Sequence, residues 1–299
     1  MFRKIFKKSI KVITYYWRLA RLEKMFDQGL PRSLHKPLRF LLDRKTKKIQ
    51  TKALIHKIEK LRKQIVAKGK EKVSIIYSPK QGYSEKDTSE SARPKHGEIL
   101  EFTMEQVART GKNKYWGTFL HLLAYCSKSK TIVELGSCVG ISGCYLSASP
   151  FCEQFITVEG SNSLASLAEK NLRQISDKYI VYKMLFDEAM DIFLPKLETG
   201  VDFVFIDGHH EKIATIHYFE RIKPKLNRGA IVVFDDILWS NDMREAWDYL
   251  SRLTGFVHAL DLGVIGICIW DGETPRPQYW TLQPLLGKVS IGKPHGWQK

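Results

Sequence analysis

The chain has 299 residues, of which 43% are hydrophobic, and this is enough to bury one sizeable core and to carry an additional segment. The formal charge of +16 is uneven, because residues 1–72 hold 23 Lys and Arg against 5 Asp and Glu, while the rest of the chain is nearly neutral. No run of about 20 consecutive, predominantly apolar residues is present, so the composition argues against an integral membrane protein.

The first residues and the cysteines indicate in which cellular compartment the protein is expected. The basic side chains Lys7, Lys8, Lys11 and Arg18 interrupt the apolar stretch at the start, which argues against a secretory signal peptide. The cysteines form no C-x-x-C pair, are odd in number and lie mostly within apolar runs, as is typical of reduced, buried thiols. They are Cys126, Cys138, Cys144, Cys152 and Cys268. We therefore expect a cytoplasmic protein.

Residues 1–72 are expected to form a basic helical arm. Apolar residues recur at steps of three or four in two stretches, with lysines and arginines between them, and this predicts amphipathic helices. The first stretch comprises Phe2, Phe6, Ile10, Ile13, Trp17 and Ala20, and the second comprises Leu54, Ile58, Leu61 and Ile65. Gly29, Pro31 and Pro37 interrupt the helical pattern between them.

Three roles of this arm are open. Basic and aromatic side chains together suit an anionic membrane surface, and the arm would then hold the protein at the inner face of the membrane. The same side chains suit single-stranded nucleic acid. In the third role, the arm is a cap whose apolar face packs on the following domain and covers its site. Membrane contact is favoured over nucleic acid because no base-reading module is present.

The segment 73–106 is expected to be a linker or cap, because Ser78–His96 is polar and has prolines near both ends. The main domain then occupies residues 107–285 and leaves a tail at 286–299. Within the domain, short apolar runs alternate with helical segments, which is typical of a parallel sheet with helices on both faces. The expected strands are 131–135, 155–159, 180–183, 201–206 and 230–234.

Two final apolar runs, 256–260 and 264–270, are separated by only three residues. So short a connection cannot cross over to a parallel neighbour, and it predicts an antiparallel hairpin at the edge of the sheet. The expected fold class is therefore α/β, with a doubly wound, mostly parallel sheet, a C-terminal antiparallel hairpin and an N-terminal helical extension.

The turn after the first strand of the domain is the most informative segment, because an apolar run ends there in spaced glycines. Gly136 and Gly140 would let backbone amides and the start of the next helix approach a ligand. Glu134 adds a negative charge, which disfavours a pyrophosphate and suits a cofactor with an amino group or a sulfonium, such as S-adenosylmethionine. Glu159, at the end of the next strand, is placed to accept both hydroxyls of a ribose. A nicotinamide dinucleotide is the rival, although Cys138 replaces the middle glycine of its fingerprint.

Three acids follow two of the expected strands: Asp207 comes after 201–206, and Asp235 and Asp236 come after 230–234. Open α/β sheets bind their ligands at the carboxyl ends of the strands. Converging carboxylates repel one another, and a hard divalent cation with oxygen ligands neutralises them. We therefore predict a magnesium site. In the alternative, Asp235 caps the following helix and Asp207 binds water or substrate directly.

His210 is the predicted general base, since a histidine titrates near neutrality and can accept the proton of a hydroxyl. Its neighbour His209 is an alternative base, a metal ligand or a surface side chain. Trp239 either lines the substrate pocket or belongs to the core. The predicted catalytic residues are therefore His210 and Asp207.

The segment from Lys112 to Leu285 resembles the class I S-adenosylmethionine-dependent O-methyltransferases, which have a Rossmann-like fold. VELGSCVGIS looks like their cofactor loop, VEGS like their ribose-binding acid, and DFVFIDGHH with VVFDDILWS like the two strand ends that bear catalytic groups. The chain is similar to the bacterial enzymes of the IDGxH type and, more distantly, to the metal-dependent catechol and caffeoyl-coenzyme A enzymes. Those metal-dependent enzymes use Asp, Asp and Asn, so Asp236 departs from their pattern.

This resemblance implies transfer of a methyl group from S-adenosylmethionine to a hydroxyl of a small-molecule or lipid-linked acceptor, with magnesium as a second cofactor. The implied cofactor-binding residues are Glu134, Gly136, Ser137, Gly140, Ser142 and Glu159, together with Phe186 and Asp187 against the adenine ring. A nicotinamide-dependent oxidoreductase is the alternative among enzymes. The alternative outside them is a non-catalytic protein that keeps the fold and binds a membrane or nucleic acid through its arm.

Overall fold

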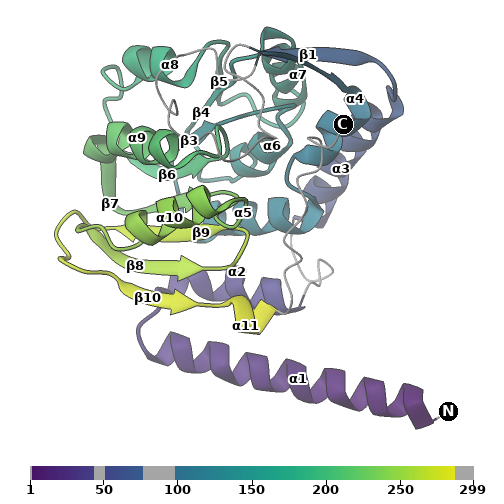
Figure 1. The fold of residues 1–299 in the computed structure, drawn as a ribbon, viewed down its shortest axis with the longest axis vertical. Helices are drawn as coiled ribbons and strands as arrows, with labels where there is room; N and C mark the ends of the chain where they lie inside the picture. Colours follow the sequence, from purple (N-terminus) through teal and green to yellow (C-terminus); the bar gives the residue numbers. More distant parts are fainter. Residues whose placement is uncertain (1, 44–50, 77–97, 287–299) are drawn as a thin grey trace.

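The computed structural model describes residues 2–43, 51–76 and 98–286, and it has a central sheet between two layers of helices (Figure 1). The strands of this sheet are β3 (Thr131–Leu135), β4 (Gln154–Val158), β5 (Tyr179–Tyr182), β6 (Val201–Ile206), β7 (Leu226–Phe234), β8 (Phe256–Asp261), β9 (Gly266–Trp270) and β10 (Gln278–Thr281). Their order is β10-β8-β9-β7-β6-β3-β4-β5, and all neighbouring pairs are parallel except the two that involve β9.

Each face of the sheet is covered by helices and holds its own hydrophobic cluster. One face carries α5 (Lys114–Cys126), α6 (Ile141–Ser147) and α7 (Asn162–Leu172), and the other carries α8 (Phe186–Phe193), α9 (Lys212–Ile222) and α10 (Asn241–Leu250). A short helix, α11 (Gln283–Leu286), follows the last strand. Because both faces are covered, the central strands are buried along their length, which explains why they appear in the sequence as unbroken apolar runs.

Polar side chains determine where several helices begin. Thr103 and Gln106 form a reciprocal capping box at the start of α4 (Met104–Thr110). The Asn113 side chain accepts two backbone N–H groups at the start of α5, and Ser240 accepts one at the start of α10. These caps fix the chain on both sides of the carboxyl edge of the sheet, where the site described below lies.

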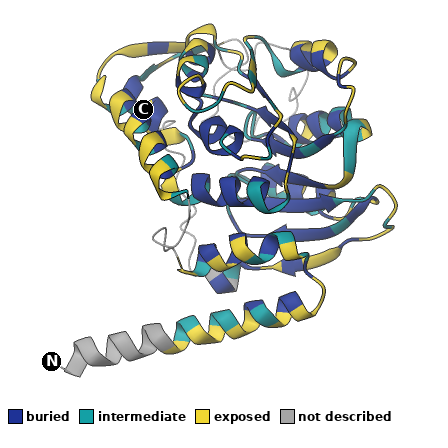
Figure 2. Cartoon of the chain, turned by 180° about the vertical axis from the view of Figure 1, so that it is seen from behind, coloured by how far each residue is buried: buried dark blue, intermediate teal, exposed yellow. Residues whose placement is uncertain are grey.

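The N-terminal segment contains α1 (Phe2–Asp27), α2 (Arg32–Asp43) and α3 (Lys52–Ala67). The predicted apolar face of α3 is buried in the same cluster as α5 and α6, and the Tyr145 hydroxyl donates a hydrogen bond of 2.9 Å to Glu59. Residues 1–72 are therefore not a separate arm, because α2 and α3 belong to the core of the domain. In Figure 2, the described part of α1 lies along one side of the protein; Leu22, Met25 and Phe26 are buried in the same cluster as α2 and α3, and the other described residues of α1 are exposed or half-buried. The side chains of residues 2–12 lie outside the described part of the chain.

Two further predictions need correction. The expected linker contains a two-stranded sheet of β1 (Lys72–Ile76) and β2 (Ile99–Thr103), which leads directly into α4. The predicted hairpin of β8 and β9 is present, but β10 pairs in parallel with β8, so that the hairpin is not at the edge of the sheet. The segment Ser78–His96 and residues 287–299 of the predicted tail lie outside the described residues.

The α/β class with a mostly parallel sheet is confirmed. The predicted strands agree closely with the observed ones, and the largest difference is that β7 begins four residues earlier than expected. None of the helices in the described ranges has both the length and the apolar composition needed to cross a membrane.

Candidate functional site

The glycine turn lies between the end of β3 and the start of α6. Gly136 has a φ of +102° and Gly140 has a φ of +77°. A Cβ on Gly136 would lie 2.0 Å from the carbonyl oxygen of Asp207, and a Cβ on Gly140 would lie 2.8 Å from the Cα of Ala168. The glycines are therefore required for the close approach of neighbouring chain segments, which differs from the predicted access of a ligand to the backbone.

Several backbone N–H groups of this turn donate hydrogen bonds to carbonyl groups of the protein itself. The N–H groups of Gly136 and Ser137 both donate to the carbonyl of Val158, over 3.0 and 3.2 Å. The N–H of Gly140 donates to the carbonyl of Ser137 over 2.7 Å. A ligand at this turn would therefore be held mainly by side chains.

Glu159 is the side chain best placed for such a contact. Its Oε2 accepts a hydrogen bond of 2.8 Å from the N–H of Cys138, and its Oε1 accepts one of 3.0 Å from the N–H of Ser161. These bonds fix the half-buried carboxylate at the end of β4, and each oxygen keeps a lone pair for a further donor. The arrangement fits the predicted role of Glu159 as an acceptor for ribose hydroxyls.

Glu134 lies beneath the turn and is fully buried. Burial raises the pKa of Glu134 to about 7, although hydrogen bonds from Ser142 and Thr157 act in the opposite direction. The Thr157 hydroxyl donates to Glu134 Oε2 over 2.7 Å. Ser137 and Ser142 are also buried, so these predicted cofactor contacts support the turn from inside the protein.

The three predicted acids come together at the carboxyl ends of β6 and β7. Asp235 is buried, while Asp207 and Asp236 are partly exposed. Burial raises the pKa of all three carboxyl groups, and in Asp235 the charge of Asp207 raises the pKa further while the ammonium of Lys112 lowers it. Three neighbouring acids, one of them buried, are costly unless a cation balances part of their charge.

Lys112 supplies that cation, and it is not among the site residues predicted from the sequence. Its ammonium forms an ion pair with Asp235 Oδ2 and lies 3.7 Å from Asp236 Oδ1, with only 9% of the side chain exposed. Burial by itself lowers the pKa of Lys112, but the charges of Asp235, Asp207 and Asp236 raise it above its ordinary value. A single lysine in the loop between α4 and α5 gives no periodic signal in the sequence, so only the fold brings it to the acids.

The observed arrangement does not fit the predicted magnesium ion. Magnesium needs oxygen ligands at about 2.0–2.1 Å in a near-octahedral arrangement. The Lys112 ammonium already contacts Asp235, which would have to be one of those ligands. Within residues 2–43, 51–76 and 98–286, no three His, Cys, Asp or Glu side chains are grouped so that they could hold a metal ion.

His210 faces the open side of the acids. Its Nε2 lies 3.9 Å from both Asp207 Oδ1 and Asp236 Oδ2, and 30% of the side chain is exposed. The His210 ring lies 5.7 Å from the ring of Trp239, measured between centroids. Because Trp239 is half-buried beside His210, its position favours a pocket wall over a core residue.

The turns at this edge of the sheet contain unusual backbone conformations. Cys138, His209 and Asp236 have positive φ values of 48°, 67° and 50°, and they follow β3, β6 and β7. A non-glycine residue in this region costs on the order of 1 kcal/mol or more, and such strain is concentrated at functional sites. The His209 Nδ1 lies 2.8 Å from the Tyr218 hydroxyl, so this histidine is bonded to α9.

Phe186 and Asp187, which were predicted to lie against the adenine ring, have different positions in the structure. Asp187 is buried and accepts hydrogen bonds from His217 Nε2 over 2.7 Å and from Arg221 Nη1 over 3.0 Å, so it joins α8 to α9. The ring of Phe186 lies against Gly208, where an added Cβ would be 2.8 Å from the Phe186 ring. Phe186 therefore lies beside the site, whereas the carboxylate of Asp187 is hydrogen-bonded to side chains of α9.

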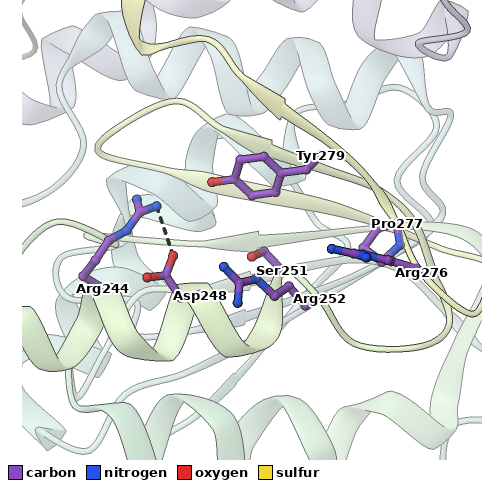
Figure 3. Close-up of a pocket in the computed structure, with 7 residues that line it drawn as sticks. All are labelled: Arg244, Asp248, Ser251, Arg252, Arg276, Pro277 and Tyr279. Carbon is purple, nitrogen blue, oxygen red and sulfur yellow. Dashed lines mark ion pairs between the residues drawn. The ribbon is translucent and has the colours of Figure 1, made fainter.

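A pocket of about 300 Å³ lies between α10 and the start of β10 (Figure 3). Arg252, Arg276 and Tyr279 line it, and Arg244 forms an ion pair of 3.0 Å with Asp248 on its wall. None of the predicted site residues lines this pocket. It is therefore separate from the glycine turn and the acids.

A comparison with protein families identifies the segment that holds the turn and the acids. Residues 133–237 match the family described as a methyltransferase domain. This segment, about a third of the chain, is therefore similar to a methyltransferase domain. A catechol O-methyltransferase from Niastella koreensis is 30% identical over 126 residues, which are 41% of this chain and 56% of that protein. The match thus covers little more than half of the relative's own length.

Solved structures also resemble the methyltransferase domain. An O-methyltransferase from Bacillus cereus in complex with SAH is 18% identical, with a TM-score of 0.46, and covers 56% of this chain and 87% of its own. The O-methyltransferase TomG from Streptomyces achromogenes, in complex with SAM, is 21% identical, with a TM-score of 0.45 and the same coverage.

The fold brings only part of the predicted site residues to the carboxyl edge of the sheet. The residues gathered at the carboxyl edge of the sheet are Glu159, Phe186, Asp207, His210, Asp235 and Asp236, joined by Lys112. Glu134, Ser137, Ser142 and Asp187 are buried behind this edge and support it.

Proposed function

We propose that this chain transfers a methyl group from S-adenosylmethionine to a hydroxyl of a small-molecule or lipid-linked acceptor. The observation that carries this proposal is that Glu159, Asp207 and His210 all follow strands that end at the same edge of the sheet, within the segment that matches a methyltransferase domain. Magnesium has no part in the proposal, because Lys112 already neutralises Asp235.

The cofactor would lie along the turn after β3. When bound, it supplies a methyl group on a sulfonium, which is a good leaving group. Glu159 would accept the ribose hydroxyls, and Phe186 would lie beside the adenine ring. Glu134 would not touch the cofactor but would hold the turn from below through Thr157. The protein's contribution is therefore to fix the cofactor before the acceptor arrives.

His210 would move the proton. When bound, the cofactor would supply the methyl group to the acceptor oxygen and leave with the bonding electrons on its sulfur, while His210 Nε2 would accept the proton of the acceptor hydroxyl. The carboxylates of Asp207 and Asp236, each 3.9 Å from that nitrogen, would stabilise the resulting imidazolium. Trp239 would exclude water from one side of the reacting groups.

Titration calorimetry with S-adenosylmethionine tests the proposal. We expect one binding site per chain, and we expect Glu159→Ala to weaken the affinity by about 10- to 100-fold, because hydrogen bonds to a charged group contribute about 1.5–3 kcal/mol. Glu153→Ala is the control, since Glu153 is an exposed acid paired with Lys130. Binding of a nicotinamide dinucleotide without binding of S-adenosylmethionine would favour the rival oxidoreductase.

We also propose that α1 attaches the chain to an anionic membrane surface. Ile13, Tyr16 and Trp17 are 68%, 63% and 53% exposed, and their spacing places them on one stripe of the helix. Arg21 and Lys24 are exposed on the next turns, and the Arg21 guanidinium lies 5.6 Å from the Trp17 ring. Aromatic side chains with flanking basic residues are typical of helices that lie in a membrane interface.

Vesicle sedimentation tests this attachment. We expect binding to vesicles that contain phosphatidylserine, weak binding to neutral vesicles, and a roughly tenfold lower partition coefficient for Trp17→Ala, because burying a large apolar side chain contributes about 1.5–3 kcal/mol. Tyr249→Ala is the matched control, since Tyr249 is an exposed aromatic residue on α10. Tighter binding to single-stranded RNA than to anionic vesicles would contradict the assignment.

A further inference from the structure

Lys112 is held in place from both sides, so its position among the acids is not that of a mobile surface lysine. On one side, Arg62 of α3 donates to the carbonyl of Lys112 itself and, over 3.1 Å, to the carbonyl of Ala108. On the other side, Asn113 caps α5 immediately after it. The Arg62 guanidinium is in turn paired with Glu59 over 3.2 Å.

The charge of Lys112 is matched to its surroundings. A buried ammonium is unfavourable unless acids surround it, and buried carboxylates are unfavourable unless a cation does. Lys112 forms an ion pair with Asp235, and its ammonium lies 3.7 Å from Asp236. Both acids are more than a hundred residues away in the chain, so only the fold brings them to Lys112. One ammonium therefore offsets part of the negative charge of the acids, and it occupies the place beside Asp235 that a metal ion would take.

We infer that Lys112 is the permanent cation of the acceptor site, and that it keeps divalent metal ions out of that site. This inference rests on the proposed function, and within it Lys112 is a positioning residue that acts through the acids. A divalent ion at Asp235 would have to lie beside the ammonium, and two cations about 4 Å apart repel each other even in a polar environment. Methyl transfer by this chain then needs no added metal and survives a chelator.

Manganese binding, followed by electron paramagnetic resonance, tests the inference without measuring activity. We expect the full-length wild-type chain to bind no Mn²⁺ below about 1 mM at this site. We expect Lys112→Gln to gain one Mn²⁺ site with an affinity about 10-fold higher or more, because a unit positive charge next to the acids has been removed. Lys114→Gln is the matched control: Lys114 is an exposed lysine two positions along the chain and should leave Mn²⁺ binding as in the wild type.

Three results would overturn the inference: micromolar Mn²⁺ binding by the wild type that is lost in Asp235→Asn, a folded Lys112→Gln variant that gains no site, or loss of wild-type turnover in a chelator. If Lys112→Gln fails to fold, the wild-type titration still decides, because it needs no variant. A failure of S-adenosylmethionine to bind would instead overturn the proposed function, and the Mn²⁺ titration is independent of that result.

Discussion

Replacing Gly136 by alanine should remove most of the stability of the methyltransferase domain together with its cofactor binding. The new methyl group would lie 2.0 Å from the backbone carbonyl oxygen of Asp207, and neither group is at the end of a flexible side chain. The turn after β3 and the turn after β6 would have to separate. We expect the free energy of unfolding to fall by about 3 kcal/mol or more in urea titrations, and binding of S-adenosylmethionine to fall with it.

Gly29→Ala is the control that separates the steric clash with Asp207 from the cost of a positive φ. Gly29 has a φ of +106°, almost equal to that of Gly136, but no atom lies within 4 Å of its added Cβ. The left-handed conformation alone should therefore cost about 1–2 kcal/mol in Gly29→Ala. Equal losses in the two variants would show that the close approach of Gly136 to Asp207 does not matter.

Replacing His210 by glutamine should slow methyl transfer by about 100- to 10,000-fold, which is the usual contribution of a general base. The His210 side chain is 30% exposed, and its contacts with Asp207 and Asp236 are long, at 3.9 Å each, so the loss of stability should be small. The change should appear in kcat under saturating acceptor, while the affinity for S-adenosylmethionine stays within a few fold. Single-turnover kinetics with a labelled methyl group would measure the chemical step directly.

His217→Gln is the matched control for His210→Gln. His217 is a partly exposed histidine on α9, and its Nε2 is hydrogen-bonded to Asp187 away from the acids. Its loss should affect stability and leave the chemical step nearly unchanged. If both variants slowed the reaction equally, or if His210→Gln kept full turnover, another group would have to be the base.

The sheet could be predicted from the sequence because strands buried on both faces are unbroken apolar runs. β3 and β6 are examples, since nearly all of their residues are buried. β10 escaped prediction because it has only four residues, of which one is buried, and it pairs at the edge of the sheet. β1 lies in a basic segment, and its partner β2 is only partly buried, so neither shows a regular apolar pattern.

The site was only partly predictable, because strand ends can be found in a sequence and loop contacts cannot. The meeting of Asp207 with Asp235 and Asp236 followed from two strands that end at the same edge of the sheet. The ion pair of Lys112 with Asp235 joins a helix–helix loop to a strand end, and no spacing in the chain indicates it. The burial of Glu134 beneath the turn could likewise not be predicted, since a charge at a strand end is usually solvated.

The hydrogen bond from Arg62 to the carbonyl of Lys112 ties the proposed acceptor site to a segment that precedes the family-matched region. Swapping this segment for that of a distant homologue would remove a brace from the loop that supplies the cation, even though every residue of residues 133–237 stayed the same. In chimaeras joined at the boundary of the matched region, Lys112 should therefore be held less firmly beside Asp235. Exchanging α3 and the loop that contains Lys112 together should avoid this effect.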